Sequence, residues 1–247
     1  MPKYVLTFQY DGTNYVGWQV QPKDASVQKT CQEVLETVLR QKADLTGAGR
    51  TDSGVHALAQ TAHIEVDTPL DLYRFKSSMN GLLPDDVRLL SVEEKPEDFH
   101  ARYSAKGKIY RYHIALKGKE SLFKRKYQWV LPYREFDVEK LKQGAKRLLG
   151  EHDFKGFASE NHRGAASYDS IRTMKRLDIE EGEELILTFE ADGFLYKMVR
   201  NLVGTLVDVG RGYFPPERIA EVLETGDRKL AGQAAPAHGL FLVKVLY

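Results

Sequence analysis

The order of hydrophobic patterns along the chain restricts its fold more than any other feature. Over residues 4–10, large apolar side chains alternate with other residues, which is the period of a β-strand with one buried face. The same reasoning predicts four further elements in the first part of the chain, namely a helix at 27–39 capped by Ser26, a strand at 57–66, a helix at 71–81 and a strand at 87–92. Residues 1–105 are therefore predicted to form a unit in which strands and helices alternate.

The remaining residues, 106–247, predict a second unit of similar content. Its expected elements are strands at 109–116 and 127–131, a helix from Val138 to Gly150, a hairpin at 171–179 and 185–190 turned at Glu181-Gly182, a helix starting at Phe194, a short helix after Pro215-Pro216, and a strand at 240–246. The strands look partly antiparallel, which favours an α+β fold over a doubly wound parallel sheet.

Composition limits the class of protein. A hydrophobic content of 42% and a charged content of 29% are ordinary for a globular protein, and no apolar stretch approaches the ~20 residues of a membrane span. The first residues enter a strand pattern without a signal-peptide core, so we expect a cytoplasmic protein. Cys31 is the only cysteine, which excludes an internal disulfide, and its place on a helical stripe predicts a small core residue.

The segment Gly47–His56 is the strongest candidate for a site, because three glycines bracket Arg50 and Asp52. Glycine permits backbone conformations that hold side chains in a cleft. A P-loop is excluded, since Val55 and His56 stand where a Lys and a Ser or Thr would bind phosphate and magnesium. A dinucleotide fingerprint fails because Asp52 replaces the third glycine. A functional loop and a surface turn with an ion pair both remain open from these residues alone.

The charge pattern predicts local rather than global affinity for nucleic acid. The net charge is only +1, but the segment from Arg102 to Lys126 is strongly basic, with Glu120 as its only acid. Lys124, Arg125 and Lys126 are expected to extend an RNA footprint. The acidic stretch from Asp178 to Glu184 is expected to lie away from phosphate.

Metal and hydrolase chemistry are not expected. The histidines form no His-Glu-x-x-His pair, and one cysteine cannot build a thiolate zinc site, so we predict no metal. A carboxylate held in a cleft can serve as nucleophile or base by itself, so we also predict no cofactor. Ser53 lies near His56, but the Gly-x-Ser-x-Gly nucleophile elbow is absent.

Five segments in order along the chain resemble the tRNA pseudouridine synthase A family. They are Tyr10–Gln19, Gly47–Gln60, Phe99–Tyr103, Lys108–Tyr112 and Phe194–Gly204. The resemblance implies two ferredoxin-like halves that share an extended, largely antiparallel sheet with an RNA cleft between them. It also implies a homodimer that converts uridine to pseudouridine at positions 38, 39 and 40 of the tRNA anticodon stem-loop.

The same resemblance implies roles for individual residues. Asp52 would be the catalytic residue, reacting at C1′, adding to the ring or removing a sugar proton. Arg50 would enter the space left by a flipped base, Tyr110 would stack on the uracil, and Arg200 would pair with Asp52. Tyr110 and Tyr112 share one face of a predicted strand, so burial in the core is the alternative for Tyr110. RNA contacts are implied at two segments, Phe99, His100, Ala101, Arg102 and Tyr103, and Glu160, Asn161, His162, Arg163 and Gly164.

Two rival functions keep some of these features. A binding-only RNA chaperone would use the basic and aromatic residues and leave Asp52 a structural role. A nucleotide hydrolase would use the glycine loop, but this chain lacks the phosphate-binding lysine that such an enzyme needs.

Overall fold

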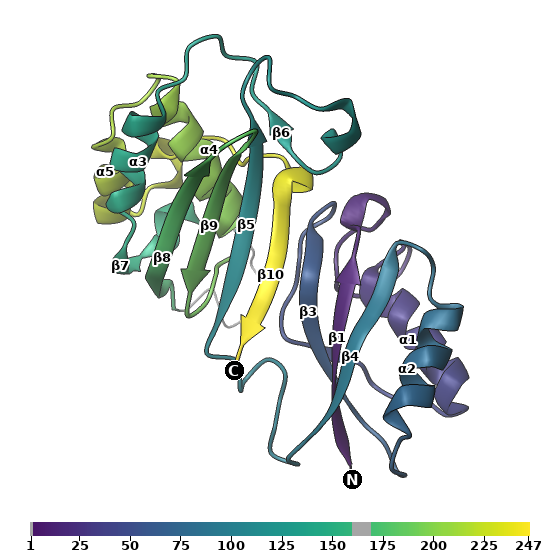
Figure 1. Cartoon of the computed structure of the whole chain (residues 1–247). Helices are drawn as coiled ribbons and strands as arrows, with labels where there is room; N and C mark the ends of the chain where they lie inside the picture. Colours follow the sequence, from purple (N-terminus) through teal and green to yellow (C-terminus); the bar gives the residue numbers. More distant parts are fainter. Residues whose placement is uncertain (1, 160–168) are drawn as a thin grey trace. The chain divides into compact units, whose positions relative to one another are not determined.

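The computed structural model of the chain describes residues 2–159 and 169–247. It divides into two units, each of which contains strands and helices (Figure 1). The first unit comprises Met1–Lys106 together with Phe241–Tyr247, and the second comprises Gly107–Leu240. The last strand of the chain thus groups with the first unit. Each unit is described by itself.

The sheet of the first unit is built around its N-terminal strand. β1 (Lys3–Tyr10) pairs antiparallel with β3 (His56–Glu65) on one side and with β4 (Val87–Lys95) on the other. β10 (Leu240–Leu246) runs parallel to β3, and the short β2 (Thr46–Gly47) pairs antiparallel with it. The sequence order of strand, helix, strand, helix and strand in this part of the chain is confirmed.

Helices α1 (Val27–Leu39) and α2 (Leu72–Leu82) lie on one face of this sheet (Figure 1). The Ser26 side chain accepts a hydrogen bond from the Lys29 N–H, which confirms the predicted N-cap. Cys31 is fully buried on the inner face of α1, as expected for a core residue.

The sheet of the second unit is antiparallel along its main path. β5 (Gly107–Ala115), β9 (Leu185–Ala191), β8 (Ile171–Glu181) and β7 (Gly150–Asp153) follow one another as antiparallel neighbours, and β8 and β9 form the predicted hairpin. β6 (Trp129–Val130) pairs parallel with β5 and is shorter than predicted. The reason is that the Tyr127 N–H donates to the Lys124 carbonyl, which closes a turn before the strand begins.

Helices α3 (Val138–Lys146), α4 (Met198–Gly210) and α5 (Arg218–Thr225) lie on one face of the strands of the second unit (Figure 1). α3 ends before the predicted Gly150, which has a φ of +99° and already belongs to β7. α4 begins later than predicted, because Lys197 adopts a left-handed conformation that a helix interior does not allow.

The predicted fold class is confirmed, because the two units combine helices with mostly antiparallel strands. Within the described part of the chain, no helix combines the length and apolar character needed to cross a bilayer.

Candidate active site and nucleic-acid interface

The loop that carries Asp52 is held by backbone hydrogen bonds to the segment after β1. The Trp18 N–H donates to the Thr51 carbonyl at 3.2 Å, and the Gly54 N–H donates to the Tyr15 carbonyl at 3.2 Å. The Val55 N–H closes a turn onto the Asp52 carbonyl at 3.1 Å. The backbone on both sides of Asp52 is therefore fixed, while its side chain is only partly buried.

Two glycines permit this close approach of the two segments. Gly17 has a φ of +106°, and a Cβ there would lie 2.3 Å from the Thr51 carbonyl oxygen. A Cβ on Gly12 would lie 2.0 Å from the Val55 carbonyl oxygen. Neither position accepts a side chain without moving the loop. Two of the five segments recognised in the sequence thus pack directly against each other.

Aromatic and hydroxyl side chains support the loop from beneath. The hydroxyls of Tyr10 and Thr51 lie 2.8 Å apart in the interior, and the Tyr10 ring stacks on the Trp18 ring at 6.0 Å. The Gln60 side-chain amide donates to the Gly49 carbonyl at 3.0 Å. Arg50, by contrast, is exposed. The loop therefore combines a rigid base with two charged side chains at its surface.

His56 anchors the end of the loop, a role that the sequence reasoning did not identify. Its buried ring stacks on Phe241 at 4.6 Å, and its Nδ1 accepts the Gly12 N–H at 3.0 Å. Asp11 Oδ1 lies 3.1 Å from the same nitrogen. A histidine at the start of a strand carries no sequence signal that distinguishes an anchor from a catalytic group.

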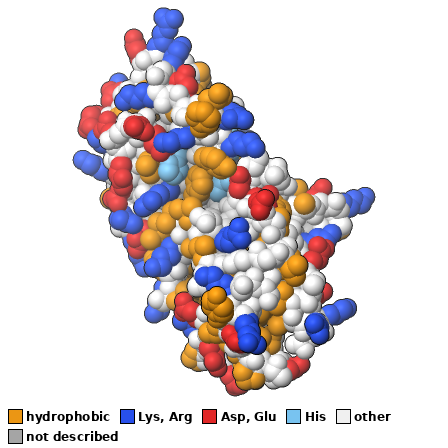
Figure 2. Space-filling view, turned by 45° about the vertical axis from the view of Figure 1, so that its right-hand side comes forward, with side chains coloured by type: hydrophobic (Ala, Val, Ile, Leu, Met, Phe, Trp, Pro, Cys, Tyr) orange, Lys and Arg blue, Asp and Glu red, His pale blue; other side chains and the backbone are white. Residues whose placement is uncertain are grey.

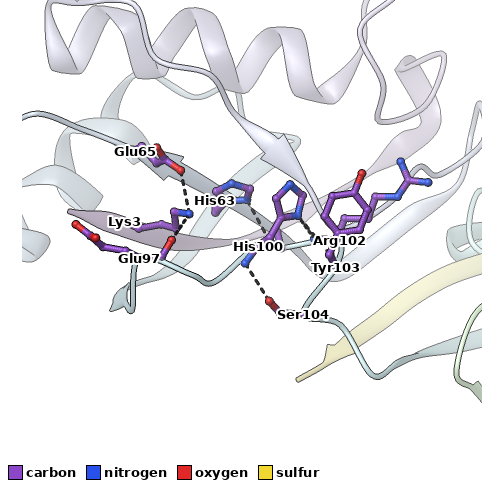
Figure 3. Close-up of polar contacts among 9 residues, drawn as sticks. Lys3, His63, Glu65, Glu97, His100, Arg102, Tyr103 and Ser104 are labelled. Atoms are coloured by element: carbon purple, nitrogen blue, oxygen red, sulfur yellow. Dashed lines mark hydrogen bonds and ion pairs between the residues drawn. The ribbon is translucent and has the colours of Figure 1, made fainter. Parts of the chain in front are cut away.

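The predicted RNA-binding segment Phe99–Tyr103, named here the 99–103 loop, belongs to the same unit. Figure 3 shows His100, Arg102 and Tyr103 of this loop. Tyr103 is 77% exposed, and the Arg102 guanidinium lies 5.7 Å from the centre of its ring. The His100 ring lies tilted against the Tyr103 ring with their centres 4.3 Å apart, and His100 Nδ1 accepts the N–H groups of Arg102 and Tyr103 at 3.1 and 3.3 Å. The exposed arginine can bind a phosphate and the exposed ring can stack on a base, and both side chains are already held in place.

A partly buried polar cluster lies beside this loop (Figure 3). The Lys3 ammonium is 2.9 Å from Glu65 and donates to the Glu97 carbonyl at 2.6 Å. The neighbouring His63 is 6% exposed, and its Nδ1 accepts the Ala101 N–H at 3.2 Å. Burial, aided by the nearby His100 and Lys3, lowers the pKa of His63 to about 4. His63 is therefore neutral at pH 7.

The depressed pKa of His63 predicts a pH-dependent stability. The unfolded chain takes up the histidine proton near pH 6.5 and the folded chain only near pH 4, so acid in this window favours unfolding. We divide the unfolding equilibrium constant of the wild type by that of His63→Asn. This ratio is expected to rise by up to about tenfold for each unit by which the pH falls between 6.5 and 4. Urea titrations of both proteins at pH 7, 6, 5 and 4 measure this ratio. A ratio independent of pH would contradict the assignment of a neutral buried His63.

Tyr110 lies in the second unit on the buried face of β5, together with Tyr112 and Ile114. It is 7% exposed, and its ring meets Phe194 edge to face at 5.0 Å. Tyr112 is fully buried and donates its hydroxyl to the Pro236 carbonyl at 2.7 Å. The predicted sharing of one strand face is confirmed. Tyr112 has a purely internal partner, whereas Tyr110 contacts a residue of another recognised segment.

Arg200 lies in the first turn of α4, where a positive charge opposes the helix dipole. Its Nε donates to the Ala235 carbonyl at 2.8 Å, and the Ala235 N–H donates back to the Arg200 carbonyl at 2.9 Å. α4 and the segment 231–236 are in very close contact, since a Cβ on Gly204 would lie 1.7 Å from the Gln233 carbonyl oxygen. The position of Arg200 is therefore set by tertiary contacts rather than by helix stability.

The basic run between Arg102 and Lys126 is partly neutralised, contrary to expectation. Lys124 lies 3.3 Å from Glu184 and 3.9 Å from Glu183. The acidic turn between β8 and β9 thus faces a lysine that we assigned to the RNA footprint. On the face shown in Figure 2, Lys and Arg side chains are interspersed with Asp and Glu. Sequence-local charge counts missed this pairing because the partners are far apart along the chain.

The structure thus brings Arg50, Asp52 and the 99–103 loop into the first unit, and Tyr110 and Arg200 into the second. The other predicted RNA-binding residues, Glu160 to Gly164, lie outside the described residues. Across residues 2–159 and 169–247, no group of three or more His, Cys, Asp or Glu side chains is arranged to hold a metal ion.

Comparison with known proteins relates the chain to one family. A family model described as tRNA pseudouridine synthase matches residues 6–104 and 145–247. The tRNA pseudouridine synthase A 1 of Protochlamydia amoebophila (strain UWE25) is 48% identical over 246 residues, which cover 99% of this chain and 96% of that protein. The tRNA pseudouridine synthase A 2 of Clostridium perfringens (strain 13 / Type A) is 42% identical, covering 98% of both proteins.

Among solved structures, the chain is similar to one in the "Crystal Structure of a Cbf5-Nop10-Gar1 Complex". The TM-score is 0.37 at 14% identity, and the match covers 96% of this chain and 57% of that one.

Proposed function

We propose that this chain, which belongs to the tRNA pseudouridine synthase A family and isomerises uridine in tRNA, uses Asp52 as its catalytic residue at positions 38, 39 and 40 of the anticodon stem-loop. The observation that carries the proposal is the geometry of the Asp52 loop. Backbone hydrogen bonds hold both flanks of Asp52, and its carboxylate is left only partly buried on a supported base. Such rigidity is what a reacting group requires.

The reaction needs no external reactant. The bond from C1′ to N1 breaks, the uracil turns, and C5 bonds to C1′ while C5 loses its proton and N1 gains one. A carboxylate can assist this exchange without a cofactor, because it can act as nucleophile or base. Sugar chemistry at an anomeric carbon commonly depends on such a group.

The target uridine has to leave its stack before Asp52 can reach it. We assign Arg50 to the space left by the flipped base, and its exposed side chain two residues before Asp52 supports this role. Tyr110 is assigned to stack on the uracil. Its ring is held by Phe194, so stacking would cost little side-chain entropy.

Arg200 is assigned to keep the catalytic carboxylate ionised and oriented. Its unfavourable place in the first turn of α4 supports a functional rather than a stabilising role. An arginine beside a carboxylate favours the charged form.

The 99–103 loop binds the RNA: Arg102 contacts a phosphate, and Tyr103 packs against a base or a sugar. Family resemblance adds the residues Glu160, Asn161, His162, Arg163 and Gly164. The same resemblance is the basis for proposing a homodimer that works in the cytoplasm. Sedimentation equilibrium is expected to give twice the mass of one chain.

One assay tests the proposed reaction against its rivals. The protein is incubated with tRNA that carries tritium at uridine C5, without metal or nucleotide. Release of tritium to water is expected, since C5 becomes the glycosidic carbon. A binding-only chaperone would shift the tRNA in a gel and release nothing, and a nucleotide hydrolase would require a nucleotide. Sequencing of the modified sites is expected to place pseudouridine at positions 38 to 40, and modification elsewhere would contradict the site assignment.

Arg102→Ala is expected to weaken tRNA binding by about tenfold and to reduce the salt dependence of binding by about one phosphate contact. The reason is that the exposed guanidinium is held over Tyr103 and is free to reach the backbone of the RNA. Filter binding at several salt concentrations measures both effects. Arg74→Ala is the matched control, because the Arg74 side chain is 85% exposed and its ion-pair partner within the described part of the chain is the nearby N-cap residue Asp71. Equal loss of affinity in both variants would contradict a specific role for Arg102.

A further inference from the structure

We infer that His63 is a positioning residue for tRNA recognition, because its ring connects strand β3 to the 99–103 loop and holds that loop in the shape that presents Arg102 and Tyr103. The inference rests on the proposed RNA-binding role of the loop. His63 itself is only 6% exposed, so we assign it no direct contact with RNA.

The first step concerns the peptide groups of Ala101, which lies at the centre of the loop and is fully buried. Its N–H donates to His63 Nδ1 at 3.2 Å, and its carbonyl accepts the Tyr247 hydroxyl at 2.8 Å. Both backbone groups of Ala101 are thus bonded to side chains of the framework. A buried N–H that loses its acceptor is costly, so the loop would shift if His63 were apolar.

The second step leads from His63 to the surface (Figure 3). The His63 ring lies 4.7 Å from the His100 ring, which in turn lies 4.3 Å from the exposed Tyr103 ring. The same His100 ring accepts the N–H groups of Arg102 and Tyr103 through Nδ1. A displacement of His63 is therefore transmitted through one ring to both side chains proposed to touch RNA.

The third step concerns the protonation state that this arrangement needs. His63 Nδ1 accepts a hydrogen bond only while it carries no proton. The charged or titratable groups that face it are Lys3 from β1, Glu65 from β3 and His100 from the loop, and a backbone hydrogen bond joins it to Thr46 of β2. Lys3 pairs with Glu65, so the negative charge of the carboxylate beside His63 is balanced by the lysine rather than by a histidine proton. The histidine remains neutral and able to accept.

The Asp52 loop has anchors of its own, to Gly49, Thr51 and Gly54, none of which involves His63. Disturbing His63 should therefore affect binding of tRNA more than the chemical step. This separation of KM from kcat distinguishes a positioning residue from one that merely stabilises the fold.

The test compares His63→Leu with His63→Asn, because the Asn side-chain oxygen replaces Nδ1 as an acceptor while Leu offers none. We expect His63→Leu to raise the KM for tRNA by about tenfold with kcat within about twofold of the wild type. His63→Asn is expected to restore KM to within about threefold. The matched control His152→Leu changes a histidine in the second unit and should leave both constants unchanged.

A His63→Leu variant that is folded, as judged by circular dichroism, and has the wild-type KM would overturn the inference. A loss of kcat at unchanged KM would also overturn it. In either case, tritium release by the wild type still tests the proposed function separately, so failure of the His63 inference can be told apart from failure of the proposed function.

A second measurement needs no variant. In 15N spectra of the wild type, His63 is expected to be neutral from pH 8 to 5, with its proton on Nε2 and a free lone pair on Nδ1 directed at Ala101. A His63 that is charged at pH 7, or that carries its proton on Nδ1, would overturn the inference even if the leucine variant fails to fold.

Discussion

Asp52→Asn is expected to reduce tritium release from C5-labelled tRNA by at least about 10³-fold. The amide matches the carboxylate in size, and the Asp52 backbone carbonyl, which accepts the Val55 N–H and closes the turn, is unchanged by the substitution. The loop should therefore keep its shape while it loses the charged oxygens that react. Affinity for tRNA is expected to stay within about threefold of the wild type, because the proposed RNA contacts lie elsewhere.

The matched control is Asp44→Asn, which changes an exposed carboxylate shortly before β2. Its rate should equal that of the wild type. Rapid-quench measurements under single-turnover conditions report the chemical step without product release. Near-normal turnover of Asp52→Asn would refute the catalytic assignment. If Asp52→Asn lost both tRNA binding and turnover, Asp52 would instead have a structural role, which is the role that it has in a binding-only protein.

Gly17→Ala is expected to lower kcat by about a hundredfold, although Gly17 lies far from Asp52 in the sequence. The added Cβ would sit 2.3 Å from the Thr51 carbonyl oxygen, and the φ of +106° is unfavourable for alanine. The loop has to move, and a displacement of about 1 Å at a reacting group costs on the order of 10² in rate. The variant should also unfold at lower temperature.

Gly81→Ala is a useful comparison, since it makes the same chemical change in helix α2. A Cβ at Gly81 meets no atom of the described residues within 4 Å, and its φ is not left-handed. This variant should keep full activity and gain about 0.5–1 kcal/mol in the free energy of unfolding. Rates are compared per folded molecule, with thermal unfolding followed by circular dichroism. If Gly17→Ala retained wild-type kcat, the rigidity of the loop could not be the basis of catalysis.

Several features were predictable because they depend on neighbours in the sequence. The Ser26 cap, the hairpin of β8 and β9, and the common face of Tyr110 and Tyr112 follow from local periodicity and turn chemistry. Errors occurred at element ends. The helix predicted from Phe194 begins at Met198, because apolar periodicity does not register the left-handed conformation of Lys197.

The candidate site was predictable only in part. Arg50 and Asp52 stood out because glycines surround them, whereas Trp18, His56 and Gln60, which support their loop, carry no local signal. The pairing of Lys124 with Glu184 was missed, since a basic run looks uninterrupted until distant acids fold beside it. Likewise, His63 appeared to be an ordinary strand residue.

Residue order alone identified the family, the α+β class and the acid side chain around which the proposal is built, because those depend on motifs and short-range patterns. The folded chain decided what surrounds that acid. It placed the segment after β1 against the Asp52 loop, returned the last strand to the first unit, and set His63 beneath the 99–103 loop. These contacts join residues that are distant in sequence, and burial and close packing, which select them, act only once the chain is folded.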